Sequence, residues 1–186
     1  YQAIKLGLEQ VEKNKIVTFG IRPTHPETGY GYLEVAENLV DSAMAIKKFH
    51  EKPDLETAQN MVAQGSYLWN AGIFMFRAKE MVDAFEQFAP HLIKPVQDAY
   101  KNGKQDLNFF HLDPTHWDKS ESISIDYAIM EKSDSLVTIS FNAGWSDLGD
   151  WNAVSNVMDT DNNNLVLSEN AHAIDCQNTM LRSDDD

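Results

Sequence analysis

Apolar residues recur along the chain with two periods, one typical of helices and one typical of strands. Over residues 2–13 they recur every three or four positions, and a β-branched strand follows over 16–21. Residues 49–76 read in order as the end of a strand, a turn, a helix and a second strand. This order is that of an α/β crossover. The pattern therefore predicts an α/β fold with a mixed, mostly parallel sheet flanked by helices.

The crossover segment carries its own start and stop signals. Pro53 ends the first strand and favours extended backbone at Lys52, the residue before it. Asp54 is placed to cap the following helix, and Gly65 is placed to end it. These signals fix where the first strand ends, and open α/β sheets usually bind ligands at such strand ends.

Further helices and strands are predicted beyond the crossover. Helical patterns cover 78–87, 92–100 and 124–132, a strand covers 136–141, and Asp150 is placed to cap a helix over 151–158. No element is predicted over the aromatic, irregular stretch 105–119. We expect a main domain over 1–158, a polar linker over 159–164, and the start of a C-terminal β region over 165–186, with strands over 165–168, 171–176 and 179–182.

Composition and charge narrow the class of protein. The 186 residues are 42% hydrophobic, which suits one globular domain with a real core. Fifteen basic against twenty-nine acidic residues give a net charge of −14, which repels nucleic acid and anionic membranes. No apolar run approaches the ~20 residues of a membrane span, and Cys176 is the single cysteine. We therefore expect a cytoplasmic protein that binds neither nucleic acid nor membranes.

Candidate ligand-binding residues lie at the end of the first crossover strand and within the second. Glu51 could accept hydrogen bonds from sugar hydroxyls, and the Lys52 ammonium could neutralise a phosphate. The alternative is a solvated pair of opposite charges. Polar Asn70 and small Gly72 interrupt an apolar strand, so a ligand or another backbone is expected to approach there. On pattern alone, Gly31 is a turn residue, since a lone G-x-G is a weak phosphate signal.

Asp147 is a candidate metal ligand. It lies in a glycine-flanked bend after a strand, and Mg²⁺ typically takes one or two carboxylates together with substrate phosphates. The alternative is an acid that only shapes the turn. Residues 159–164 begin like a calcium loop but have Asn164 where the glycine belongs, which favours a linker. Without the resemblance to a family, the residues thus predict an α/β domain with a candidate anion or sugar site.

Four segments, read together and in order, resemble one family. They are Val17–Tyr32, Phe49–Pro53, Trp69–Phe74, and Ser124–Lys132 followed by Gly144–Trp151. This combination is similar to the bacterial mannose-1-phosphate guanylyltransferases, which make GDP-mannose for polysaccharide biosynthesis. The resemblance covers nearly the whole chain. It implies a partial Rossmann-like nucleotidyltransferase domain.

The resemblance implies roles for individual residues in the sugar pocket. Tyr30 and the backbone of Gly31 would line it, and Glu51 would hold mannose hydroxyls. Asn70 would add a sugar contact, with Gly72 leaving room for it.

It also implies two residues for catalysis. Lys52 would hold the sugar phosphate, and Asp147 would be one of two carboxylates on Mg²⁺. The substrates would be mannose-1-phosphate and GTP. The reaction would be in-line attack of a sugar-phosphate oxygen on the α-phosphorus of GTP with loss of pyrophosphate.

One departure from the family pattern matters. A glycine-rich nucleotide loop of the G-G-x-G-x-R-L-x-P type, and the first metal aspartate with it, do not occur in this sequence. We therefore expect the sugar-phosphate part of a longer homo-oligomeric enzyme, inactive alone, whose sheet exposes an apolar edge. The alternatives are another sugar-1-phosphate nucleotidyltransferase and a non-catalytic sugar-phosphate-binding domain.

Overall fold

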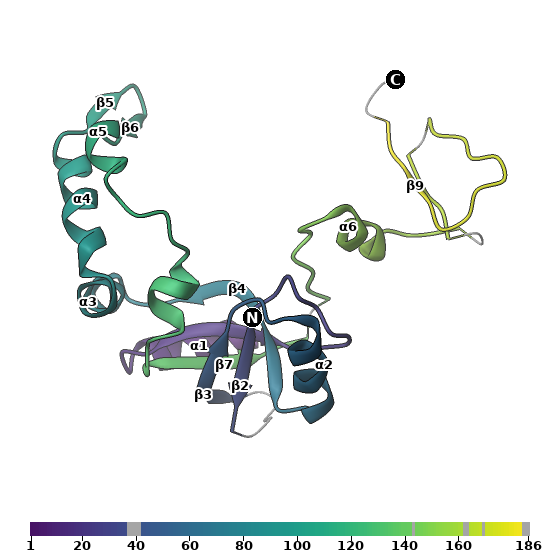
Figure 1. Ribbon diagram of the computed structural model, residues 1–186, viewed down its shortest axis with the longest axis horizontal. Coiled ribbons are helices and arrows are strands. Elements are labelled where there is room, and N and C mark those ends of the chain that lie inside the picture. Colours follow the sequence, from purple (N-terminus) through teal and green to yellow (C-terminus); the bar gives the residue numbers. More distant parts are fainter. Residues whose placement is uncertain (37–41, 143, 162–163, 169, 184–186) are drawn as a thin grey trace. The chain divides into compact units, whose positions relative to one another are not determined.

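The computed structural model describes residues 1–36, 42–142, 144–161, 164–168 and 170–183 (Figure 1). Contacts divide the chain into two compact units, Tyr1–Ala143 and Gly144–Asp186, and each is described by itself. The division lies ahead of residue 158, where the sequence places the end of the main domain. Helix α6 (Trp151–Val157) therefore groups with the second unit. The functional boundary at residue 158 stays a prediction.

Unit 1 is built on five strands that close into a small barrel (Figure 1). In order around it they are β1 (Ile16–Ile21), β4 (Tyr67–Met75), β2 (Tyr32–Val35), β3 (Ala43–His50) and β7 (Leu136–Ser140), which returns to β1. Only β1 and β7 pair in parallel, and the other four neighbouring pairs are antiparallel. The α/β class and the mixed sheet are confirmed, whereas the expectation of a mostly parallel sheet is wrong.

Strand β2 explains this difference. Strands β3 and β4 run in the same direction, as expected of a crossover, but β2 lies between them and pairs antiparallel with both. The predicted exposed sheet edge is wrong as well for the five barrel strands, because each of them pairs on both sides along its described residues. Association through such an edge loses its structural basis.

The four longest helices of unit 1 begin and end near the predicted residues. They are α1 (Gln2–Val11), α2 (Leu55–Gln64), α3 (Ala78–Phe88) and α4 (Pro90–Lys101). The Asp54 carboxylate accepts a hydrogen bond from the Thr57 amide at 2.8 Å, and Gly65 ends α2 with φ of 70°. Both predicted signals of α2 are therefore confirmed.

Two segments differ from the predictions. The aromatic stretch without a predicted element forms β5 (Lys104–Asp106), β6 (Phe109–His111) and α5 (Pro114–Trp117). Where an α-helix is predicted over 124–132, the chain forms a π-helix, η1 (Asp126–Met130). Its last three residues are buried and pack with Leu33 and Leu68 of the sheet, which fixes η1 against the barrel.

Unit 2 begins with the bend that contains Asp147. Asp150 caps α6 by accepting a hydrogen bond from the Ala153 amide at 2.7 Å, as predicted. Two of the predicted strands form the parallel pair β8 (Val166–Leu167) and β9 (Met180–Leu181), whereas residues 171–176 form no strand.

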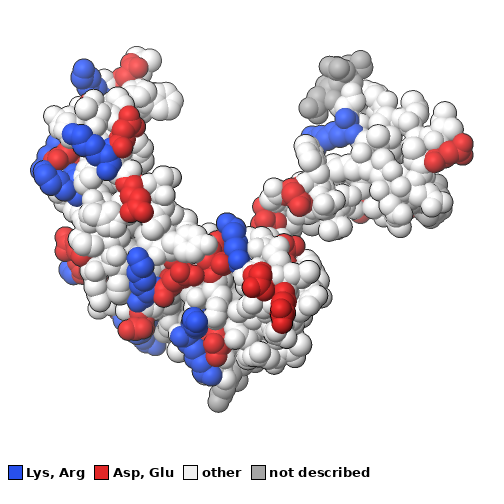
Figure 2. Space-filling model, viewed as in Figure 1, with Lys and Arg blue, Asp and Glu red and all other residues white. Residues whose placement is uncertain are grey.

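The surface of the protein carries both acidic and basic side chains. On the face drawn in Figure 2, acidic and basic side chains of the described residues are interspersed, with red and blue atoms side by side over unit 1. No helix among the described residues is long and apolar enough to cross a membrane.

Candidate functional site

An acid and a base lie next to one another directly after β3. The Lys52 ammonium is 3.2 Å from Oε1 of Glu51, and their side chains are 59% and 8% exposed. Lys52 has a φ of +48°, so the extended backbone expected before Pro53 is wrong. Such a backbone is sparsely populated by residues other than glycine and persists where the surroundings hold it. We call Glu51 and Lys52 the clamp, a buried acceptor beside an accessible cation.

Gly31 lies against the clamp. Its carbonyl accepts a hydrogen bond of 2.8 Å from the Asn70 amide of β4. A Cβ at Gly31 would lie 2.8 Å from Oε2 of Glu51 and 3.1 Å from Cζ of Phe49. Any side chain at this position would therefore displace the clamp carboxylate. Three predicted site residues, Gly31, Glu51 and Asn70, thus gather at one end of the sheet.

The Asn70 carboxamide is buried and held on both sides. Its Oδ1 accepts hydrogen bonds from the Thr18 hydroxyl at 2.6 Å and from the Gly72 amide at 3.3 Å. Its Nδ2 donates to Oδ1 of Asp126 at 3.5 Å. The oxygen is therefore committed to the protein, while the amino group faces Asp126 of η1 and keeps a second N–H for another acceptor.

Gly72 supplies a backbone conformation at an irregularity of the sheet. The pairing of β1 with β4 shifts register here, with Thr18 opposite Phe74 and Gly20 opposite Asn70. Gly72 has a φ of +69°, and a Cβ added to it would meet nothing within 4 Å. Glycine is therefore needed here for the backbone conformation and not for space, and this conformation directs the Gly72 amide towards Asn70.

Tyr30 belongs to an aromatic cluster around the buried Trp69. Its ring centroid is 5.2 Å from that of Trp69, at an interplanar angle of 83°, and the His25 ring packs on the same indole at 5.0 Å. Successive side chains of a strand point to opposite faces, so Trp69 and Asn70 of β4 point to different sides. The role of Tyr30 in a sugar pocket stays a prediction.

Negative charge is concentrated at the clamp. Burial raises the pKa of Glu51 above its ordinary value, the nearby Asp126 raises it further, and Lys52 opposes both. Burial likewise raises the pKa of Asp126, with Lys52 lowering it and Glu131 raising it. Glu51 and Asp126 therefore share the charge of one lysine ammonium, and Glu131 adds a third negative charge nearby. An accessible cation held among carboxylates and polar hydrogen-bonding groups suits a ligand that carries both hydroxyls and a phosphate.

Sequence reasoning missed three residues of this site. Asp126 and Glu131 lie in a segment that carries the family resemblance, but a helical pattern assigns them no common face. For Thr18 the sequence predicts only a position in a buried strand. Its one signal is a hydroxyl in an otherwise apolar run, and its partner Asn70 lies 52 residues away.

Asp147 belongs to unit 2, whereas the clamp belongs to unit 1. Its side chain is exposed, and a Cβ on Gly149 would collide with its Oδ2, so this glycine leaves space for the carboxylate. The bend is kept by the Ser146 hydroxyl, which accepts a hydrogen bond from the Leu148 amide at 3.3 Å. Within the described ranges, no three His, Cys, Asp or Glu side chains are grouped to hold a metal ion.

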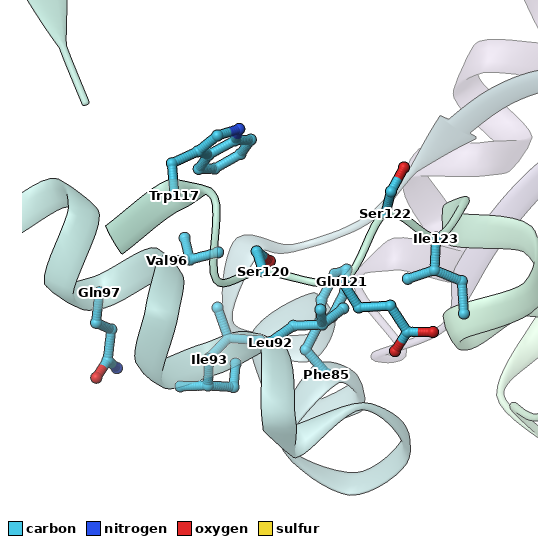
Figure 3. A pocket seen from close by; sticks show the side chains of 11 residues that line it. Phe85, Leu92, Ile93, Val96, Gln97, Trp117, Ser120, Glu121, Ser122 and Ile123 are labelled. Atoms are coloured by element: carbon cyan, nitrogen blue, oxygen red, sulfur yellow. The ribbon is translucent and has the colours of Figure 1, made fainter. Parts of the chain in front are cut away.

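A hollow with a volume of about 590 Å³ lies between α3, α4 and residues 117–123 (Figure 3). Its wall is mostly apolar, and Glu121 on its rim is paired with His91 at 2.8 Å. None of the predicted site residues lines it. The clamp, and not this hollow, therefore carries the chemistry that the sequence indicates.

Comparisons with known proteins agree on one family. The family model described as nucleotidyl transferase matches residues 2–164. The chain is 40% identical over 177 residues to the xanthan biosynthesis protein XanB of Xanthomonas campestris pv. campestris, an alignment that covers 95% of this chain and 38% of that protein. It is 36% identical over 184 residues to the mannose-1-phosphate guanylyltransferase RfbM of Salmonella typhimurium, covering 99% of this chain and 38% of that protein.

A solved structure shares the fold. The crystal structure of mannose-1-phosphate geranyltransferase from Thermus thermophilus superposes with a TM-score of 0.75 at 29% identity, covering 90% of this chain and 48% of that one. The chain spans about two fifths of the length of the two curated relatives, 38% of each. The resemblance to mannose-1-phosphate guanylyltransferases is confirmed by these relatives, and the chain belongs to the nucleotidyl transferase family.

Proposed function

We propose that the protein transfers GMP from GTP to mannose-1-phosphate, giving GDP-mannose and pyrophosphate, and that this chain binds the sugar phosphate. The observation that carries the proposal is the clamp, a buried Glu51 carboxylate beside the exposed Lys52 ammonium with Gly31 leaving space against it. The name of the relative RfbM supports the choice of mannose-1-phosphate and of a guanylyl group.

Each clamp residue has a chemical role in this proposal. Glu51 accepts hydrogen bonds from mannose hydroxyls, and the remaining N–H of Asn70 donates to a sugar oxygen. Lys52 neutralises the phosphate and holds the oxygen that attacks the α-phosphorus of GTP. A bond forms from this oxygen to the α-phosphorus, and the bond from the α-phosphorus to the pyrophosphate oxygen breaks. Positioning and charge neutralisation supply the catalysis.

We also propose Asp147 as a ligand of Mg²⁺. A carboxylate oxygen is a donor that this hard cation prefers, and Mg²⁺ commonly binds one or two carboxylates with substrate phosphates and water. One exposed carboxylate therefore fits a shared site and not a closed one. When bound, the ion would neutralise phosphate charge. Asp147→Asn is expected to raise the Mg²⁺ concentration needed for half-maximal GDP-mannose formation by the full-length protein, with Asp159→Asn of the same unit as the control.

Mannose-1-phosphate binding tests the proposed function. Isothermal titration of the chain with mannose-1-phosphate should give a saturable heat, weakened at least about tenfold by Lys52→Ala, a loss of about 1.4 kcal/mol. Lys47→Ala removes an exposed lysine of β3 and should change the affinity less than about twofold. Failure of the unmodified chain to bind mannose-1-phosphate would overturn the proposal.

Two competing functions are separated by simple changes of ligand. Tighter binding of glucose-1-phosphate than of mannose-1-phosphate would favour another sugar-1-phosphate nucleotidyltransferase. A full-length protein that binds mannose-1-phosphate but releases no pyrophosphate from GTP would be a binding domain. We expect this chain by itself to release none, and pyrophosphate from the purified chain with GTP, Mg²⁺ and mannose-1-phosphate would contradict that expectation.

We further propose a cytoplasmic homo-oligomer. Cytoplasmic placement follows from the nucleotide triphosphate that the reaction needs. Exposed apolar side chains at the β5–β6 hairpin, among them Leu107 and Phe109, support self-association. Sedimentation of the full-length protein as a monomer at high concentration would contradict it.

A further inference from the structure

The π-helix η1 brings two acids to one face. The Glu131 amide donates to the Asp126 carbonyl at 2.9 Å, which closes a turn across five residues. In an α-helix, residues five apart lie about 140° apart around the axis. The wider π turn instead stacks such residues nearly over one another. Ala128, Ile129 and Met130 between them are buried in the core, while Glu131 reaches the Glu51 amide and Asp126 reaches Asn70.

Glu131 holds the backbone of the clamp. Its Oε1 accepts a hydrogen bond of 3.2 Å from the Glu51 amide, although the two residues lie 80 positions apart. This contact holds the peptide group between His50 and Glu51, one residue ahead of Lys52 with its unusual φ of +48°. Glu131 therefore acts on the conformation from which the Lys52 ammonium projects.

Asp126 acts on the charged ends of the clamp. Its Oδ1 is held by the Asn70 amide at 3.5 Å, and Asn70 is itself fixed by the buried Thr18. The Asp126 charge raises the pKa of Glu51, and the Lys52 charge lowers the pKa of Asp126. Placing a carboxylate beside another half-buried carboxylate is unfavourable for stability. An arrangement that lowers stability in this way is typical of a functional site.

We propose that Asp126 and Glu131 are positioning residues of the clamp, brought together by the π turn, with Glu131 holding the Glu51 amide and Asp126, bound to Asn70, placing a negative charge beside the Glu51 carboxylate. The proposal rests on the proposed function, in which the clamp binds mannose-1-phosphate. Neither acid needs to contact the sugar. Their effect passes through Glu51 and Lys52.

Side-chain replacements that keep or remove the acceptor test Glu131. Glu131→Ala should shift the Glu51 amide resonance of the ligand-free chain and weaken mannose-1-phosphate binding about tenfold. Glu131→Gln keeps an acceptor oxygen and should restore both. Glu121→Gln, at a residue paired with His91 away from the clamp, is the matched control and should change neither.

Asp126→Asn tests the electrostatic effect of Asp126 on the clamp. It keeps the size of the side chain but removes a negative charge, so the Glu51 carboxyl should titrate at lower pH in ¹³C NMR of the ligand-free chain. The affinity for mannose-1-phosphate should fall several-fold. Urea unfolding of every variant identifies loss of fold, and the Gln and Asn variants, which preserve volume, decide the result where an Ala variant unfolds.

The outcomes separate the inference from the proposed function. If the unmodified chain does not bind mannose-1-phosphate but the ligand-free signals of Glu51 move as expected, the contacts stand and the sugar-phosphate assignment falls. If the chain binds but Glu131→Ala leaves the Glu51 amide and the affinity unchanged, the positioning role of Glu131 is overturned. If the pKa of the Glu51 carboxyl is the same in Asp126→Asn as in the unmodified chain, the positioning role of Asp126 is overturned.

Discussion

The Thr18 hydroxyl donates a hydrogen bond of 2.6 Å to the carboxamide oxygen of Asn70, and this bond sets which way the amide faces. The Gly72 amide, which can only donate, approaches the same oxygen at 3.3 Å and fixes the same orientation. The Asn70 nitrogen is thereby turned towards Asp126. A chain of hydrogen bonds thus links β1, β4 and η1 just behind the clamp.

Removing the Thr18 hydroxyl should destabilise the fold. Thr18→Val keeps the shape of the side chain but leaves the buried Asn70 oxygen without its shortest hydrogen bond, which costs about 1–3 kcal/mol. Urea unfolding measures the loss. Thr18→Ser keeps the hydroxyl and should retain the orientation of Asn70, at the smaller cost of one buried methyl, about 1 kcal/mol. Equal stability of Thr18→Val and the unmodified chain would show that the bond contributes little.

A methyl group at Gly31 should disturb the clamp. The added Cβ would lie 2.8 Å from Oε2 of Glu51, so the carboxylate must move. Gly31→Ala is expected to weaken mannose-1-phosphate binding at least about tenfold in calorimetric titration. Gly29→Ala is a close control, since its Cβ would lie 3.3 Å from the partly buried Glu27 carboxylate, and it should leave the affinity nearly unchanged. Full affinity in Gly31→Ala would mean that Glu51 does not hold the ligand.

Two glycines with nearly equal positive φ allow effects on stability and effects on binding to be measured separately. Gly72 and Gly65 have φ of 69° and 70°, and a Cβ at either meets nothing within 4 Å. Replacement by alanine should therefore cost each about 1–2 kcal/mol for a left-handed backbone, measured by urea unfolding. Only Gly72→Ala should also weaken mannose-1-phosphate binding, because a backbone that relaxes at residue 72 would move the amide that donates to Asn70. Equal affinities of the two variants would contradict this role.

The raised pKa of Glu51 predicts a defined dependence of stability on pH. The folded chain holds this proton at pH values where the unfolded chain has released it, so stability falls as pH rises through the window above the ordinary pKa of 4.5. Glu51→Gln removes this loss. The variant should gain stability over the unmodified chain as pH rises from about 4 towards neutrality, measured by urea unfolding at each pH.

Asp54 provides a control of opposite sign. Hydrogen bonds from Thr57 lower the pKa of this carboxyl, so its contribution to stability is present above the ordinary pKa of an aspartate and is lost as pH falls. Asp54→Asn should therefore differ most from the unmodified chain near neutral pH. A pH trend of the same sign for both variants would contradict the assignments.

Local signals in the sequence determined much of the fold. Asp54, Gly65 and Asp150 set helix ends through contacts a few residues away, so their positions could be predicted from neighbouring residues alone. The strand over 16–21 follows from its apolar, β-branched run, which any buried strand requires. The family resemblance rests on short segments and located Glu51, Lys52 and Asn70 without any tertiary information.

Only the tertiary structure decided how these segments meet. The place of β2 between β3 and β4 depends on pairing between strands distant in sequence, which periodicity does not encode. The contacts of Thr18 with Asn70 and of Glu51 with Glu131 span 52 and 80 residues. The α-helical period predicted for 124–132 gave way to a π turn whose apolar residues fill the core while Asp126 and Glu131 meet the clamp. Long-range packing, not local preference, sets that geometry.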